Sequence, residues 1–330
     1  MASLRCQLVG PGVTLLREIL VGGGGKPVVR AARRSRGLGL GILLLTGVVL
    51  ATPAVSLGAI RDEKALAERY APVVRLVSQR EECGSGEPYE PMDVNALFGE
   101  PTVALRGPWS AAGVVKIGPS AADLSRGLYQ YHLDFPGNAL EPGCDYERWA
   151  RRVTEGHVPT VYAHVATDRL HPGQLAVQYW LFYAYNDWNN LHEGDWEMIQ
   201  IVFHAENAHQ ALTTPPTAVG YSQHEGAERA GWGSSKLERV GGTHPVVYPA
   251  AGSHANFFDA GLFLGSSASQ GVGCDDTRDA GLVVHPAVVT IPSDRAAGSS
   301  SREPRRRSPM RDSWNRKTRA ITISAQIRAV

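Results

Sequence analysis

The densest group of residues that could carry chemistry lies in the segment YNDWNNLHEGDWEMIQIVF, residues 185–203. If its apolar second half is a strand, the two-residue period of strand side chains puts Asp195 and Glu197 on one face. His192 and Asp187 precede that strand on a single loop, which can fold all four side chains around one point. Buried carboxylates require neutralisation, and three carboxylates with one imidazole suit a hard cation such as Ca²⁺, Mg²⁺ or Mn²⁺. The pattern predicts a divalent-cation site; an acidic strand end paired with Arg or Lys is the alternative.

Three further residues could serve such a site. His224 follows an apparent strand, and His254 lies in a Gly-flanked turn. Either histidine could act as a general base on a metal-bound water or contact a bound headgroup. Hydrogen bonding of both histidines within the fold is the alternative interpretation. Trp188 lies in a polar loop, where its ring could line a sugar or lipid-headgroup site beside the cation.

The segments around these residues resemble two known families. EGDWE, YSQHEG and THPVVYPAAGSHANFF follow one another between residues 193 and 258, and are similar in order and wording to the vacuolar protein sorting-associated protein 62 family. More remotely, HEGDWE resembles the GHRHDWE heptapeptide of the necrosis- and ethylene-inducing, Nep1-like cytolysins, whose fold is a β-sandwich. The resemblance covers residues 70–290 and is strongest over residues 175–258.

The second resemblance implies particular site residues. In the cytolysins the first His of the heptapeptide, its Asp, its Glu and an upstream Asp bind a divalent cation. Carried over position by position, these residues are His192, Asp195, Glu197 and Asp187. Gly194 stands where the heptapeptide has its second His, and this departure weighs against lytic activity.

The elements that must position these residues are mainly strands. Residues 62–70, DEKALAERY, predict a short helix that ends before Pro72. From residue 73 onward, eleven short runs rich in Val, Tyr, Trp and Ile alternate with turn-forming residues. Runs of that number and length predict an all-β domain over residues 61–294, with a β-sandwich of two antiparallel sheets as its architecture.

The N-terminal residues predict export. Residues 1–36 carry 7 basic residues and 1 acidic residue, and residues 37–60 form an uncharged, largely apolar stretch. This stretch predicts a hydrophobic helix that is either a transmembrane anchor, with residues 1–36 as a cytoplasmic leader, or a cleaved signal segment. The domain is therefore expected outside the cytoplasm, either held at the membrane by a single pass or secreted.

Cysteine usage agrees with that compartment. Cys6 falls in the leader, whereas Cys83, Cys144 and Cys274 fall in the predicted exported domain. We expect one disulfide among these three and one remaining thiol, with all three pairings open.

Charge distinguishes the body of the chain from its C-terminal end. Residues 37–294 hold 16 basic and 29 acidic residues, which argues against nucleic-acid binding because phosphate backbones require a basic surface. Residues 295–330 hold 10 basic and 2 acidic residues and are rich in Ser and Pro, the composition of a disordered basic tail. The abrupt change in composition also allows an aberrant reading frame.

Three functions are compatible with these patterns. The first is an exported protein, membrane-anchored through its N-terminal segment, whose divalent cation orients a polar ligand such as a glycan or a lipid headgroup. The second is a metal-dependent hydrolase of phosphoester or glycosidic bonds, with His224 or His254 as the base. The third is a structural protein without turnover.

Overall fold

A computed structural model describes residues 57–293, apart from residues 109, 111, 112, 126–129, 169, 225 and 268–270. The predicted leader 1–36, most of the segment 37–60 and the predicted tail 295–330 therefore lie outside the described residues. Within the described residues, no helix combines the length and the apolar character needed to span a bilayer.

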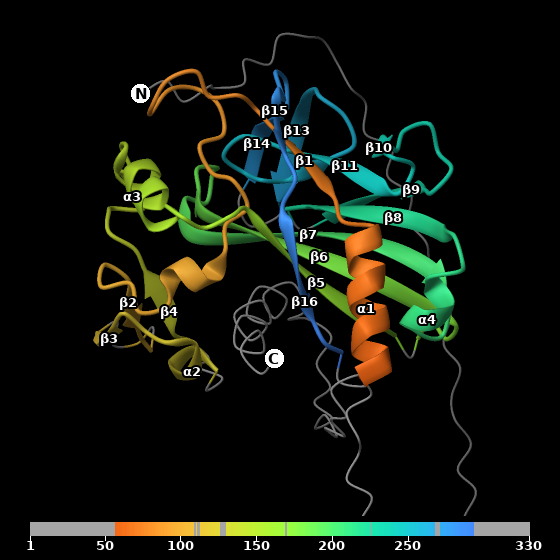
Figure 1. Cartoon of the computed structure of the whole chain (residues 1–330). Coiled ribbons are helices and arrows are strands. Elements are labelled where there is room, and N and C mark those ends of the chain that lie inside the picture. Colours follow the sequence, from red (N-terminus) through yellow and green to blue (C-terminus); the bar gives the residue numbers. More distant parts are fainter. Residues whose placement is uncertain are drawn as a thin grey trace, which may run out of the picture. The chain divides into compact units, whose positions relative to one another are not determined.

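The largest sheet has six strands in the order β16-β5-β6-β7-β8-β9 (Figure 1). Their bounds are Ala287–Ile291, Thr160–Thr167, Gln174–Asn186, His192–His204, Pro216–Gln223 and Gly226–Gly231. All neighbours pair antiparallel except β16, which runs parallel to β5. The long hairpin of β6 and β7 places Tyr183 opposite Asp195 and Asn186 opposite His192, so the predicted site lies at its closed end.

A second sheet contains β10, β11, β1 and β15 in that order, with β12 paired to β11. The bounds of these strands are Arg239–Val240, His244–Pro249, Val73–Leu76, Leu282–Val284 and Asn256–Phe257. Its first strand in the sequence, β1, pairs parallel with β11 and antiparallel with β15. One hydrophobic core joins the two sheets, because Leu76 of β1 and Val247 of β11 cluster with Leu181 of β6 and Ile199 of β7.

The predicted all-β, sandwich-like fold is confirmed, with one correction to the pairing. The expectation of purely antiparallel sheets is wrong, since both the β1–β11 and the β5–β16 pairs are parallel. Parallel neighbours require a crossover connection, and here the crossovers are long, over residues 77–243 for β1–β11 and residues 168–286 for β5–β16.

Smaller elements surround the two sheets. A three-stranded sheet has the order β3-β2-β4, with bounds Val114–Ile117, Ala104–Arg106 and His132–Asp134. The helices are α1, η1, α2, α3 and α4, with bounds Leu57–Arg69, Val94–Leu97, Ala121–Leu124, Asp145–Val153 and Ala208–Ala211. The predicted helix over 62–70 is thus present as part of α1, whereas α3 was not predicted.

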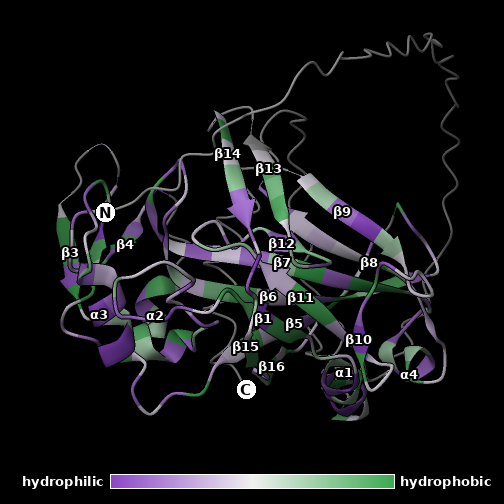
Figure 2. Cartoon of the chain, turned by 90° about the horizontal axis from the view of Figure 1, so that it is seen from above, coloured by the Kyte–Doolittle hydropathy of each residue, from purple (hydrophilic) through white to green (hydrophobic). Residues whose placement is uncertain are grey.

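Strands β13, Leu262–Ser267, and β14, Gly271–Asp276, form a hairpin that pairs with none of the other described strands. This hairpin stands out from the body of the molecule and contains hydrophobic residues in both strands (Figure 2). Leu262, Leu264 and Val272 are exposed, whereas Asp275 is fully buried. The hairpin therefore presents an apolar outer face and places a charged side chain on its inner face.

Cys83 and Cys144 form a disulfide, one of the three pairings that the sequence left open. The expectation of a remaining thiol is wrong for the described residues, because none of their cysteines is free.

The two ends of the described chain meet on α1. Glu63 of α1 is buried, and its carboxylate accepts hydrogen bonds from the backbone N–H of Ser293, at 3.0 Å, and from the Ser293 hydroxyl, at 2.5 Å. These bonds fix the residues that follow β16 against the first helix.

Candidate functional site at the β6–β7 connection

Asp195 lies at the centre of the candidate site and is 1% exposed. Its Oδ1 lies 3.2 Å from Nε2 of His192, and its Oδ2 accepts from Nδ2 of Asn186 at 3.0 Å. The same Oδ2 lies 3.0 Å from Nδ1 of His254. Burial raises the pKa of Asp195, but hydrogen bonds and positive charge from His192 and His254 outweigh it and hold the pKa well below its usual value. Asp195 is therefore an ionised carboxylate surrounded by donors from the protein.

His254 provides positive charge to this buried carboxylate. Its ring is completely buried and stacks on the ring of Tyr183 at a centroid distance of 3.9 Å. Its Nε2 lies 3.4 Å from Oε2 of Glu87. Burial lowers the pKa of His254, but the charges and hydrogen bonds of Glu87 and Asp195 outweigh burial and raise it to about 10. An imidazolium therefore lies between two buried carboxylates at neutral pH.

Glu87 links this network to the turn that carries His254. The Glu87 carboxylate accepts from the backbone N–H of Tyr89 at 2.9 Å and of Gly252 at 2.8 Å. The carbonyl of Gly252 in turn accepts from the backbone N–H of Asp187 at 2.8 Å. Glu87 was missed at the sequence level, since a single Glu before a Pro in a loop gives no signal of its partners.

Asp187 and His192 are the solvent-accessible members of the group. Asp187 is exposed, and the His192 side chain is 28% exposed. Within the described part of the chain, the Asp187 carboxylate accepts no hydrogen bond and forms no ion pair. Partial desolvation and the negative charge of Glu87 raise the pKa of Asp187, against an opposing effect of His254. Asp187 is thus an acidic group with free oxygens at the surface of an acidic site.

Glu197 has a different neighbour. It shares a face of β7 with Asp195, as the strand period predicts, but its carboxylate accepts a hydrogen bond from the Ser222 hydroxyl on β8. Among the four predicted metal ligands, His192 and Asp195 contact each other at 3.2 Å. In the part of the chain that the structure describes, one group of residues brings three potential metal-ligand atoms within 4.8 Å of one another: Glu82, Cys83 and Cys144. The two cysteine sulfurs of this group form the disulfide. Among the described residues, the four predicted ligands do not meet within that distance, and their metal site stays a prediction.

A second buried network lies under the β13–β14 hairpin. Nε2 of His224 lies 2.8 Å from Oδ2 of Asp275, and the Ser253 hydroxyl donates to Oδ1 of Asp275 at 2.6 Å. The ring of Trp188 packs on the ring of His224 at 4.1 Å. Trp188 is 6% exposed, and a role for its ring in lining a ligand site stays a prediction. Gly273 of the hairpin leaves room for the indole, since a Cβ at Gly273 would lie 2.8 Å from the Trp188 ring.

Both histidines are enclosed by the fold. His254 is protonated and enclosed between carboxylates, and His224 is covered by the hairpin. Both have a positive φ, 51° for His224 and 54° for His254, a region that non-Gly residues adopt at a cost. Here the strain serves to direct each ring onto a buried carboxylate.

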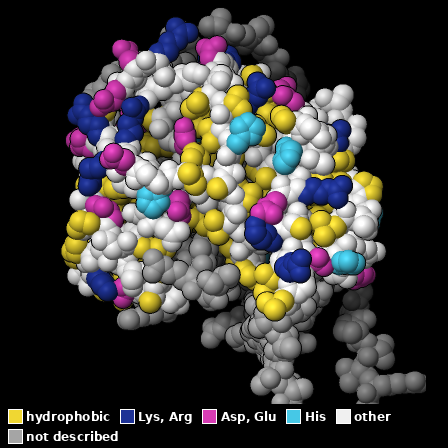
Figure 3. All heavy atoms as spheres, viewed as in Figure 1, with side chains coloured by type: hydrophobic (Ala, Val, Ile, Leu, Met, Phe, Trp, Pro, Cys, Tyr) yellow, Lys and Arg dark blue, Asp and Glu magenta, His cyan; other side chains and the backbone are white. Residues whose placement is uncertain are grey.

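Glu87 also lines a cleft of about 400 Å³. Its polar lining residues are Gln79, Glu87, Glu90, Asp93, Arg151, Thr154 and His157, and its walls include Pro88, Tyr89, Pro91 and Pro159. On the face shown in Figure 3, basic and acidic side chains are interspersed in the upper left of the view, where α3 lies. The buried carboxylate of Glu87 thus belongs to both the candidate site and this cleft.

No protein-family model and no curated protein matches the chain. Among solved structures, the chain is similar to "NLPPya in complex with glucosamine", with 14% identity and a TM-score of 0.33 over 69% of this chain and 73% of that chain. "Toxin fold for microbial attack and plant defense" gives 14% identity and a TM-score of 0.35 over 69% and 74%. Necrosis and ethylene inducing protein 2 from the causal agent of cocoa's Witches' Broom disease gives 16% identity and a TM-score of 0.24 over 39% and 50%. At these values they are remote neighbours, and the resemblance to the sorting-associated family stays a prediction.

Proposed function

We propose that this protein binds a divalent cation, Ca²⁺ or Mg²⁺, at the surface formed by Asp187 and His192, and through it a polar ligand such as a glycan or a lipid headgroup. The observation that carries the proposal is the free carboxylate of Asp187 beside the charge of Glu87. A carboxylate whose pKa is raised by a neighbouring negative charge gains free energy when a cation joins it.

Asp195 and Glu197 have supporting roles in this proposal. Asp195 orients the His192 ring, as a carboxylate behind a ligating histidine does at metal sites. The Glu197 carboxylate accepts a hydrogen bond from Ser222, between β7 and β8. In this proposal it contributes negative charge near the cation without ligating it. Oxygen-rich surroundings with one imidazole favour Ca²⁺ and Mg²⁺, with Mn²⁺ also compatible.

Ligand binding is favoured over hydrolysis by the state of the two histidines. A hydrolase needs a base within reach of a metal-bound water, and His254 is buried and protonated. His224 is bonded to Asp275 under the hairpin. The proposal includes an extracytoplasmic location, at the membrane or secreted, because residues 1–60 have the pattern of an export segment.

The test is a thermal unfolding series on the full chain, treated with chelator and then titrated with Ca²⁺ or Mg²⁺. A cation bound only by the folded state at 100 times its Kd adds about 2.7 kcal/mol of stability. We expect this gain for the parent chain and its loss in Asp187→Asn. No gain in the parent, or an undiminished gain in Asp187→Asn, would overturn the proposal.

Asp168→Asn provides the matched control. Asp168 is an exposed carboxylate with a histidine three residues away, His171, at 3.0 Å, which repeats the residue types and spacing of the His192–Asp195 pair on an open surface. This variant should retain the full cation effect. With cation present, monosaccharides and vesicles containing inositol phospholipids then serve as probes, and binding to either should disappear with chelator.

A further inference from the structure

The chain between β1 and η1 forms a closed loop, residues 78–87, here named the Cys83 loop. Its base is fixed by hydrogen bonds from Glu87 N–H to the carbonyl of Val77, at 3.0 Å, and from Ser78 N–H to that of Asp279, at 3.1 Å. Near its tip, Cys83 is joined to Cys144, which immediately precedes α3 and lies 61 residues away in sequence. The disulfide therefore ties an otherwise local loop to a distant helix.

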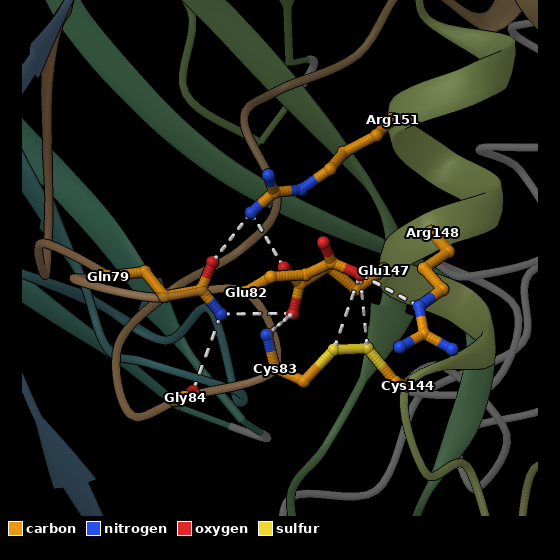
Figure 4. Close-up of a disulfide and its surroundings, with 8 residues drawn as sticks. All are labelled: Gln79, Glu82, Cys83, Gly84, Cys144, Glu147, Arg148 and Arg151. Carbon is orange, nitrogen blue, oxygen red and sulfur yellow. Dashed lines mark hydrogen bonds and ion pairs between the residues drawn. A yellow bond between two sulfur atoms is a disulfide. The ribbon is translucent and has the colours of Figure 1, made fainter.

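Polar contacts accompany the disulfide (Figure 4). The Glu147 carboxylate accepts from the backbone N–H of Cys83 at 2.9 Å and from the Gln79 amide at 3.0 Å. Arg148 pairs with Glu82 at 2.7 Å, and both side chains are at least half exposed. Arg151 also donates to the Gln79 amide oxygen at 2.9 Å. The exposed Arg148–Glu82 pair contributes little and is screened by salt, so the disulfide and the hydrogen bonds to the buried Glu147 tie the loop to α3.

Cys83 itself is exposed and has a φ of 60°, in the left-handed region that costs a side-chain-bearing residue free energy. Gly86 also lies in that region, with a φ of 125°. The loop is thus held in a conformation that its own sequence does not favour at Cys83. An exposed sulfur is also accessible to a thiol reagent.

The far end of the loop reaches the candidate site. Glu87, four residues after Cys83, accepts from Gly252 N–H at 2.8 Å and lies 3.4 Å from Nε2 of His254. Gly252 in turn accepts from the backbone N–H of Asp187. Residues of the loop, Gln79 and Glu87, also line the 400 Å³ cleft together with Arg151 of α3 and Thr154, which follows it. The disulfide thus links two segments that line the cleft, and the loop that it holds ends at the Glu87 carboxylate.

We propose that the Cys83–Cys144 disulfide is a redox-sensitive latch on this carboxylate. A dithiol reductant supplies two electrons and two protons: the Cys83–Cys144 bond breaks, two thiols form, and the reductant becomes a disulfide. The Cys83 loop then leaves α3, the cleft widens, and Glu87 releases Gly252 and His254. The consequence for cation affinity rests on the proposed function, whereas the release of Glu87 does not.

Amide hydrogen exchange on the full chain tests the latch without any cation. The N–H groups of Cys83 and Gly252 donate to Glu147 and Glu87, so their exchange reports the two contacts directly. Reduction with a phosphine or dithiothreitol should raise exchange at both amides at least tenfold. Exchange at Tyr179, in the centre of β6 and fully buried, should remain unchanged and shows that the fold persists.

The double variant Cys83→Ser/Cys144→Ser separates this disulfide from any other effect of the reductant. In the variant, Gly252 should exchange fast with or without reductant. Unchanged protection of Gly252 in the reduced parent would overturn the latch, as would a reductant effect that persists in the variant. If the variant does not fold, the parent with and without reductant still decides the question, since Tyr179 reports the fold. If reduction raises exchange at Cys83 and Gly252 as expected but Ca²⁺ does not bind the parent chain, the latch is supported and the proposed function is refuted.

Discussion

At Asp195, the buried carboxylate is neutralised by a histidine 59 positions further along the chain. His192 and Asp195 were predicted to share one site, and their side chains do meet, although residues three apart in a regular strand face opposite sides; Gly194 between them has a φ of 66°. The contacts of Asp195 with His254, and of His254 with Glu87, depend on how β7, the turn after β11 and the Cys83 loop pack. The sequence therefore predicted that the buried carboxylates need a positive charge beside them. It did not predict that the His254 imidazolium provides much of that charge.

A substitution at His254 measures this residue-scale balance. His254→Leu leaves Asp195 and Glu87 buried without their shared positive neighbour, and removing one partner of a buried ion pair costs about 3–5 kcal/mol. The free energy of unfolding in urea at pH 7 should fall by that amount. His209→Leu is the control, because His209 is 83% exposed in its pair with Asp62 and should change the free energy by no more than about 0.5 kcal/mol. Equal effects of the two substitutions would show that His254 is not held as an ion-pair partner.

At the scale of elements, the sequence patterns predicted the long strands better than the connections between them. The run LVVHPAVVTI predicts one strand, yet Pro286 divides it into β15 and β16, which belong to different sheets. Helix α3 has buried residues at Tyr146, Trp149, Ala150 and Val153, a helical spacing that was present in the sequence. The β13–β14 hairpin has weak strand signals because its inner face includes Gly265 and Gly273, which lie against the side chains of His224 and Trp188.

Adding a methyl group to that inner face tests the packing. A Cβ at Gly265 would lie 2.1 Å from Oδ2 of Asp275 and 2.5 Å from Nε2 of His224, so Gly265→Ala must displace the hairpin or break their contact. We expect a loss of about 1–3 kcal/mol in the free energy of unfolding, the usual cost of overpacking. Gly231→Ala, in β9 with nothing within 4 Å of the added atom, should change it by less than about 0.5 kcal/mol. Similar values for the two variants would mean that the hairpin does not rest on these side chains.

At the scale of the whole molecule, residues from both ends of the described chain complete the domain. The bonds between Glu63 and Ser293 join α1 to the residues after β16. The sequence predicted a helix near Glu63 and a strand near residue 290, but hydropathy alone does not show that an acidic residue on that helix is buried. The burial of Glu63 is explained by its hydrogen bonds to Ser293, which join the two ends of the described chain.

Glu63→Ala tests this closure. The substitution leaves the N–H and hydroxyl of Ser293 without their acceptor, which should lower the free energy of unfolding by about 1–3 kcal/mol. Glu68→Ala on the same helix removes an exposed pair with Lys64 and should cost no more than about 0.5 kcal/mol. Chemical denaturation of the two variants distinguishes them, and a larger loss for Glu68→Ala would contradict the closure.

The position of β1 has a consequence for biosynthesis. Among the described strands, Val73 and Val74 pair with residues 246 and 247 of β11 and with Val284 of β15, so these partners of the apolar strand are synthesised only when nearly the whole domain has left the ribosome. At roughly 5–20 residues per second, the interval between the synthesis of the strand and that of its last neighbour is roughly 10–40 seconds. Throughout that time the VVRLV segment is available to a holdase chaperone, and a nascent chain arrested shortly before Leu282 should remain its client.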